Sequence, residues 1–224
     1  MRALFLFGKN DRLRFVSHLD LQRFVQRAFN RTTLPIAFSN GFNPHPVMSF
    51  ASALAMGWTS EYEILDIKLT RDIDREFALA EMRRALPPDM PVIDVKLVKD
   101  DHPKMMASLL MADYRVTVPE DCAAAIAAQI PDFLAADSVI AMRKTKSGEK
   151  PADIRPMTVS IEAEGNVFTI RTTASETNNL KPDLLIKVLA ERAGIDAPEN
   201  IRVHRTALLG EEKGKTVALL ALKG

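Results

Sequence analysis

The chain has 224 residues and 47% of them are hydrophobic, which is enough to fill one large core or two small ones and excludes a disordered or fibrous class. Lysine and arginine number 30 against 29 acidic residues, so the formal net charge of +1 excludes a uniformly basic nucleic-acid-binding protein. Its one cysteine, Cys122, excludes an intrachain disulfide, a four-thiolate zinc site and a self-contained iron–sulfur cluster.

The first hundred residues are predicted to alternate strands and helices. Ser17, followed three residues later by Asp20, resembles a capping box, and apolar residues then recur at helical spacing. Pro87-Pro88 ends a second helix. The predicted elements are, in order, strands at 2–7 and 12–16, a helix at 17–31, strands at 36–38, 47–55 and 61–69, a helix capped by Asp72 or Asp74, and a strand at 92–98.

The second half is predicted to repeat this order. Pro131 interrupts its first helix, Gly165 lies in a hairpin turn, and Gly194 stops a helix that Pro182 begins. A polar segment at 144–153 is predicted to be a long, mobile hairpin connection. The other predicted elements are a strand at 114–118, the interrupted helix at 123–136, strands at 139–143, 158–163, 167–172 and 201–208, and an edge strand at 216–222.

Strand, helix, strands, helix, strand is the split βαβ order of a ferredoxin-like domain. We therefore predict an α+β fold of two tandem ferredoxin-like units, with domains at 1–104 and 105–224. The first domain would carry the functional site, and the boundary would lie within 99–108.

A cationic ridge is predicted on the first helix. Arg23, Arg27 and Arg31 recur at intervals of four residues and so share one helix face. Each guanidinium can form bidentate contacts to phosphate, and Arg14 precedes the helix by three residues. The same spacing also fits a solvated helix face that binds nothing.

Two histidines form a second group of candidate residues. His18 lies at the start of the first helix with Ser17 and Asp20, where free N–H groups attract anions. His45 lies between two prolines that restrict its backbone, six residues after Ser39. The group fits an acid/base pair acting on RNA, a metal site, or a ligand-binding rim, and it also fits a purely structural cap with His18 partly buried. The small number of ligands argues against metal.

Two further residues are candidates for anion binding. Gly41 can adopt a positive φ and expose consecutive N–H groups as an anion-binding nest, although a tight turn fits equally well. Arg155 precedes Pro156, which keeps it extended, and Asp153 is placed to hold its guanidinium as an ion pair.

Several motifs resemble the radical SAM-linked protein family of unknown function. They are Arg14-Phe15-Val16-Ser17-His18-Leu19-Asp20, Ser39-Asn40-Gly41-Phe42-Asn43-Pro44-His45-Pro46, Ser49-Phe50, Ser60-Glu61 with Asp66, Asp153-Ile154-Arg155-Pro156, and Lys181-Pro182-Asp183-Leu184-Leu185. The resemblance implies a companion radical SAM protein, as a neighbour or fused domain, and a setting near ribonucleases of the E/G type. It implies no known reaction. Lys181 stands where relatives are expected to have arginine, and radical chemistry would belong to the partner because this chain lacks a three-cysteine motif.

The leading hypothesis is an RNA-binding or substrate-presenting accessory protein that works with a radical SAM enzyme and is not an enzyme on its own. We expect no cofactor, no bound metal and no membrane segment, and a cytoplasmic location, because the apolar start at residues 1–7 is too short for a signal sequence. The predicted RNA- or anion-binding residues are Arg14, Ser17, His18, Arg23, Arg27, Ser39, Gly41, His45 and Arg155.

Two alternatives remain open. One is a metal-independent RNA endonuclease with His18 or His45 as general acid or base. The other is a protein-interaction module. All of these functional hypotheses depend on one spatial prediction, namely that the start of the first helix and the histidine turn meet in a positively polarised pocket for an anionic group.

Overall fold

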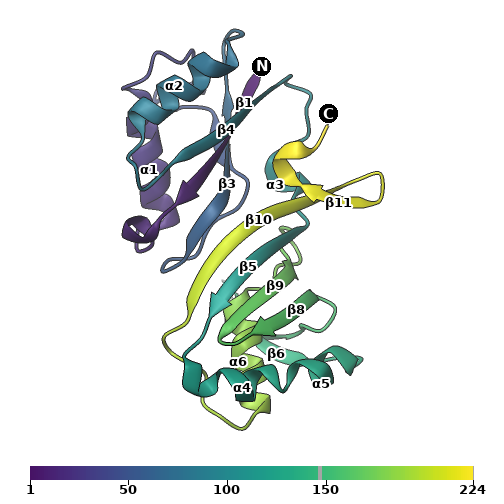
Figure 1. Cartoon of the computed structure of the whole chain (residues 1–224). Coiled ribbons are helices and arrows are strands. Elements are labelled where there is room, and N and C mark those ends of the chain that lie inside the picture. Colours follow the sequence, from purple (N-terminus) through teal and green to yellow (C-terminus); the bar gives the residue numbers. More distant parts are fainter. Residues whose placement is uncertain (146–147, 224) are drawn as a thin grey trace. The chain divides into compact units, whose positions relative to one another are not determined.

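The computed structural model describes residues 1–145 and 148–223 (Figure 1). The chain forms two compact units, one of residues 1–109 with 207–224 and one of residues 110–206. The sequence predicted domains at 1–104 and 105–224, so the C-terminal segment belongs with the first unit and not with the second. The reason is local packing, because Leu219 and Leu222 are buried and the first unit's Lys96 donates a hydrogen bond to the Leu220 carbonyl.

The first unit is built on antiparallel strands. β1 pairs with β3 on one side and β4 on the other, and β2 pairs with β3. Its elements are β1 (Arg2–Lys9), a 3-10 helix (Asp11–Leu13), α1 (His18–Phe29), β2 (Met48–Phe50), β3 (Thr59–Lys68), α2 (Arg75–Ala85), β4 (Val92–Val98), α3 (Met105–Ser108), β11 (Lys215–Ala218) and the 3-10 helix η2 (Leu219–Ala221).

The core of this unit lies between the sheet and two helices. Figure 1 shows α1 and α2 on the same face of the sheet of β1, β3 and β4. Alternate residues of β1, Ala3, Phe5 and Phe7, belong to this core with Val25 of α1 and Met82 of α2. The predicted caps are confirmed. Ser17 accepts the N–H of Asp20 at 3.1 Å, and Asp74 caps α2.

The predicted strand at 12–16 is wrong, because this segment forms the 3-10 helix and a turn. The buried Lys9 ammonium donates to the carbonyls of Arg14 at 3.4 Å and Val16 at 3.0 Å, and the Gly57 N–H donates to the Arg14 carbonyl at 2.8 Å. These carbonyls are therefore satisfied by side chain and loop donors instead of a strand neighbour. The predicted strand at 47–55 is likewise reduced to β2.

The second unit is also of the α+β class. β9 pairs with both β5 and β8, and β6 pairs with β7 as a separate two-stranded sheet. Its elements are β5 (Met111–Thr117), α4 (Glu120–Ala127), α5 (Ile130–Ala135), β6 (Ile140–Thr145), β7 (Gly148–Asp153), β8 (Thr158–Glu164), β9 (Val167–Thr173), α6 (Pro182–Arg192) and the start of β10 (Arg202–Glu212).

Most local signals in this half are confirmed. The helix predicted at 123–136 divides into α4 and α5, with Pro131 in the first turn of α5. Gly165 and Gly194 have positive φ, 57° and 70°, in the hairpin turn and after α6. The polar segment at 144–153 differs from the predicted hairpin connection, because residues 148–153 form β7. Residues 146–147 of that predicted connection lie outside the described residues. None of the described helices is long and apolar enough to cross a membrane.

A buried ion pair joins two strands of the first unit. The Arg2 guanidinium donates to both carboxylate oxygens of Asp66, at 2.9 and 2.5 Å, and to the carbonyl of His102 at 2.5 Å. The two side chains are only 1% and 6% exposed. Removing one partner of such a pair leaves the other charge buried and uncompensated.

We predict that Asp66→Asn lowers the free energy of unfolding by about 3–5 kcal/mol, because the Arg2 charge then lacks its counter-ion. Urea denaturation followed by circular dichroism measures this loss. The double variant Arg2→Met with Asp66→Asn should recover part of the loss. Equal stability of Asp66→Asn and the natural chain would contradict a structural role for the pair.

Candidate functional site

The start of α1 is a capping network. The Ser17 hydroxyl donates to a carboxylate oxygen of Asp20 at 2.7 Å, and Asp20 also lies 3.5 Å from the Arg23 guanidinium. The His18 ring packs edge-on against Phe50, with ring centroids 5.2 Å apart. Ser17, Asp20 and His18 therefore all have structural roles, while Arg23 remains mostly exposed.

The second predicted group lies in a hairpin at residues 38–46, closed by a bridge between Phe38 and Pro46. Ser39 holds His45, because its hydroxyl lies 3.0 Å from Nδ1 and accepts the His45 N–H at 3.1 Å. Gly41 has φ of 117°, as expected for a tight turn or a nest. Phe42 at the tip is fully exposed.

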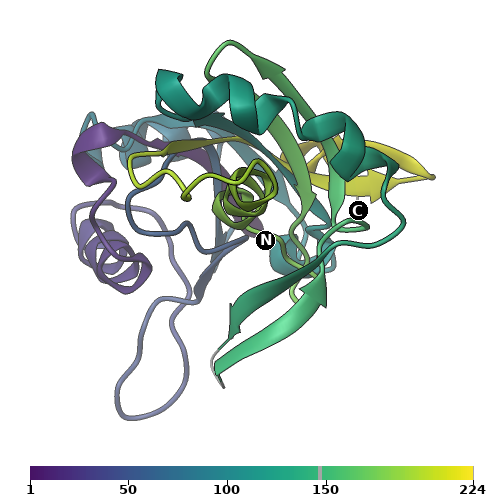
Figure 2. The same ribbon diagram turned by 90° about the horizontal axis from the view of Figure 1, so that it is seen from below.

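The group at the start of α1 and the group in the hairpin each have local contacts of their own. The hydrogen bonds of His45 go to Ser39 and Asn43 within its own hairpin, and the His18 ring contacts Phe50. Figure 2 shows the hairpin as a long slate-blue loop that extends away from α1. Ser17 and Asp20 thus form contacts at the start of α1, and Ser39 and His45 form theirs within the hairpin. That the two groups meet in one pocket stays a prediction.

The cationic ridge is shorter than the sequence predicted. Arg23 and Arg27 are exposed on α1, and Arg27 has no hydrogen bond or ion pair to any described residue. Arg31 instead donates to the carbonyl of Ala85, the last residue of α2, at 2.7 Å. The predicted ridge of three arginines is therefore reduced to Arg23 and Arg27.

Three exposed aromatic residues of the first unit were not among the residues predicted from the sequence. Phe15 is 66% exposed, and the Arg14 guanidinium lies 4.6 Å from its ring centroid. Phe38 is 53% exposed, and Phe42 projects from the same hairpin. Large apolar side chains that remain in water mark interaction sites when they gather. The signal was available in the sequence, since all three rings lie in polar, turn-rich segments.

The Arg155 guanidinium forms its hydrogen bonds with backbone carbonyls of the second unit. Its Nε and Nη2 donate to the carbonyl of Leu134 at 3.1 and 2.9 Å, and its Nη1 donates to the carbonyl of Thr158 at 3.1 Å. The predicted Asp153–Arg155 ion pair is replaced by backbone contacts, because Asp153 accepts the N–H groups of Val139 and Arg155. The bond from Val139 is the main reason that the pKa of Asp153 is lowered.

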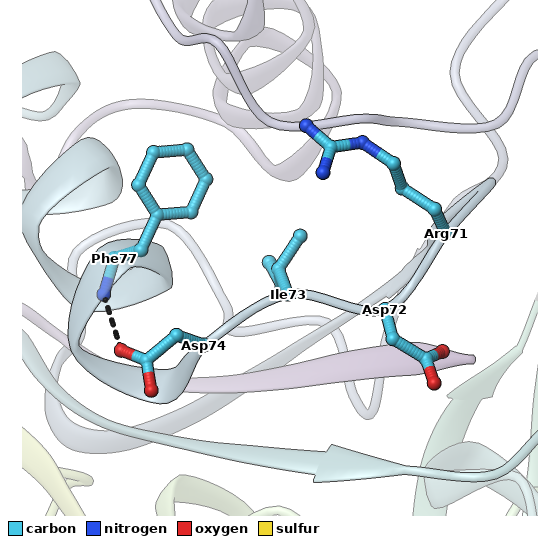
Figure 3. Close-up of a pocket in the computed structure, with 5 residues that line it drawn as sticks. All are labelled: Arg71, Asp72, Ile73, Asp74 and Phe77. Atoms are coloured by element: carbon cyan, nitrogen blue, oxygen red, sulfur yellow. Dashed lines mark hydrogen bonds between the residues drawn. The ribbon is translucent and has the colours of Figure 1, made fainter.

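Figure 3 shows a hollow at the start of α2, lined by Arg71, Asp72, Ile73, Asp74 and Phe77. Asp74 accepts the N–H groups of Glu76 at 2.8 Å and Phe77 at 3.2 Å. Its carboxylate therefore caps the helix. Within residues 1–145 and 148–223, no three His, Cys, Asp or Glu side chains are grouped to hold a metal ion.

The structure defines an α+β protein whose first unit leaves the side chains of Phe15, Phe38 and Phe42, and those of Arg23 and Arg27, exposed. The chain belongs to DUF2344, a family of uncharacterized proteins conserved in bacteria, whose profile matches residues 2–182. A chain in the crystal structure of a Cbf5-Nop10-Gar1 complex is similar over 92% of this chain and 48% of that chain, with 11% identity and a TM-score of 0.49. No curated protein matches the sequence.

We predict that Arg155→Ala destabilises the protein by about 2–3 kcal/mol, because each carbonyl left without a donor costs roughly 1–3 kcal/mol. Thermal and urea unfolding measure the loss. The exposed Arg192 of α6 provides the control, since Arg192→Ala should change stability by less than about 0.5 kcal/mol. If Arg155→Ala kept full stability but bound RNA more weakly, the result would contradict the structural role and support the predicted binding role of Arg155.

Proposed function

We propose that this protein binds single-stranded RNA through its first unit and presents it to a partner enzyme. The observation that carries the proposal is the exposed Phe15 ring with the Arg14 guanidinium stacked on it. Proteins hold single strands by stacking bases on aromatic rings and guanidinium planes and by placing cations along the backbone. The α1 surface offers both kinds of group.

The stacking part of the surface has three rings. Phe15 follows the turn before α1, and Phe38 and Phe42 lie at the base and tip of the hairpin. Stacking does not depend on which base is present, so this surface would tolerate many sequences. Ser39 and His45 act as positioning residues here, because their mutual hydrogen bonds fix the hairpin that carries two of the rings.

The phosphate-binding part consists of Arg23 and Arg27. Both are exposed, one turn apart on α1, and the Arg23 side chain is engaged only by the similarly exposed Asp20 at 3.5 Å among the described residues. An exposed ion pair of this length contributes little, so a phosphate can replace the carboxylate. Two such contacts give an affinity that falls with rising salt.

The radical SAM partner is a separate part of the proposal. It is supported by the motif resemblance around Ser17-His18 and Asn43-Pro44-His45, while the family description names no partner. Cys122 is the only cysteine, so any iron–sulfur cluster would have to be held by the partner. This protein would then supply the bound RNA and the partner would supply the chemistry.

The two ferredoxin-like units also remain a proposal, and the strand orders support it. In the first unit the order β4-β1-β3, with β2 paired to β3, is that of a split βαβ domain. In the second unit the order β10-β5-β9-β8 fits the same plan, with the β6–β7 ribbon as an insertion. A ferredoxin-like sheet is a platform that many unrelated functions use, so it carries no function by itself.

We predict that a fluorescein-labelled 12-nucleotide oligouridine binds with a log affinity that falls linearly with log salt, measured by fluorescence anisotropy. Arg23→Gln and Arg27→Gln should each reduce the slope by about 0.7. Phe15→Ala and Phe42→Ala should weaken binding by about 1–3 kcal/mol per lost stacking contact, with little change in slope.

Arg192→Gln in the second unit is the matched control and should leave both affinity and slope unchanged. The oligonucleotide should be recovered intact, because the accessory role needs no cleavage. Absence of binding at low salt would remove the proposal. Cleavage that is lost in His45→Ala would instead favour the endonuclease hypothesis.

A further inference from the structure

A second hollow lies in the first unit, on the sheet face that α1 and α2 leave open. It has a volume of about 670 Å³ and is lined by Leu6, Tyr62, Arg75, Asp94, Val95, Lys96, Leu97, Leu220 and Ala221. The strand register explains the location. Leu6 pairs with Asp94 on β4 and Ile64 on β3, so Lys96 and Tyr62, two residues further along these strands, share the face of Leu6.

Lys96 brings a positive charge to this hollow. Its ammonium donates to the carbonyls of Leu220, at 3.1 Å, and Leu222, and the carboxylate of Glu212 acts on it only through the longer-range electrostatic attraction. An ammonium has three N–H donors, so one remains for another acceptor. Partial burial is the main reason that the pKa of Lys96 is lowered, and the nearby Glu212 carboxylate opposes this shift.

Tyr62 supplies a second donor. Its hydroxyl oxygen accepts the N–H of Leu220 at 3.3 Å, and the hydroxyl proton has no acceptor among the described residues. Burial raises the pKa of Tyr62, so the phenol stays protonated and can donate. On the rim, the Arg75 guanidinium forms an ion pair with Asp94, so the Asp94 charge is already compensated.

The remaining lining is apolar. Leu6 and Leu220 are each 9% exposed, and Ala221 lies between Leu220 and the end of the turn. An occupant therefore meets the exposed edges of apolar side chains beside one ammonium and one phenolic donor. Pockets for small ligands combine these properties, an apolar lining and a few convergent polar groups.

We propose that this hollow, the Lys96 cleft, binds a small organic anion that has one charged group and a flat apolar body. The charged group accepts from the third Lys96 N–H and from the Tyr62 hydroxyl, and the flat body lies against Leu6 and Leu220. The cleft is separate from the aromatic and arginine surface around α1, so this proposal stands whether or not the protein binds RNA.

The dye 8-anilinonaphthalene-1-sulfonate tests the proposal, because it joins one sulfonate to flat aromatic rings. We expect saturable binding to the full chain with one site, measured by fluorescence titration. Lys96→Met should weaken that binding at least tenfold, and Tyr62→Phe should weaken it severalfold. Lys99→Met, an exposed lysine just beyond β4, is the matched control and should change affinity less than twofold.

Lys96 also caps the C-terminal turn, so Lys96→Arg is needed as a variant that keeps both charge and donors. It should retain affinity within about threefold, because the arginine keeps a cation with several N–H donors at this position. Unchanged or tighter dye binding in Lys96→Met would show that Lys96 only holds the turn and would overturn the proposal. Absence of saturable binding by the natural chain would overturn it as well.

Discussion

The first unit depends on the buried ion pair between Arg2 and Asp66 on one face of its sheet. Arg2 opens β1, which is buried along its whole length, and its guanidinium reaches Asp66 on β3 and the carbonyls of His102 and Pro103. Burial of two charges is tolerated only when their geometry and hydrogen bonds are nearly complete, as they are here. The pair therefore fixes the segment after β4 as well as the relation of β1 to β3.

That segment in turn holds the end of the chain. The His102 ring lies 3.1 Å from the Leu222 carbonyl through Nε2, and the Lys96 ammonium donates to the same carbonyl. Arg2 supports His102 by binding its backbone oxygen. One face of the sheet thus carries a polar network that secures η2, while the other face carries the apolar core beneath α1.

Patterns that depend on neighbouring residues were predictable, and those that depend on distant partners were not. β4 was predicted at 92–98 and is Val92–Val98, because its alternation is local. The structure of the segment at 12–16 was predicted wrongly. Its carbonyls accept from the Lys9 side chain and from the N–H of Gly57, which lies far along the chain. Most residues of the candidate site were predicted on the elements where they lie, but Arg14 lies in a turn and not in the predicted strand. Sequence spacing also does not reveal that Ser17 bonds Asp20 and that Ser39 bonds His45.

The arginines show why charge alone is a poor guide to a nucleic-acid surface. Arg31 binds the Ala85 carbonyl, Arg83 binds those of Val92 and Ile93, and Arg155 binds those of Leu134 and Thr158. A guanidinium has five donors, so it can cap backbone groups at element ends as readily as it binds phosphate. Exposed aromatic rings are a better indicator of a binding surface than arginines. Leaving Phe15 or Phe42 in water has a free-energy cost, and these rings provide no comparable support for the fold in return. For the proposed RNA-binding surface the exposed rings are therefore the more specific signal, with Arg14 lying on the Phe15 ring and Arg23 and Arg27 exposed on α1.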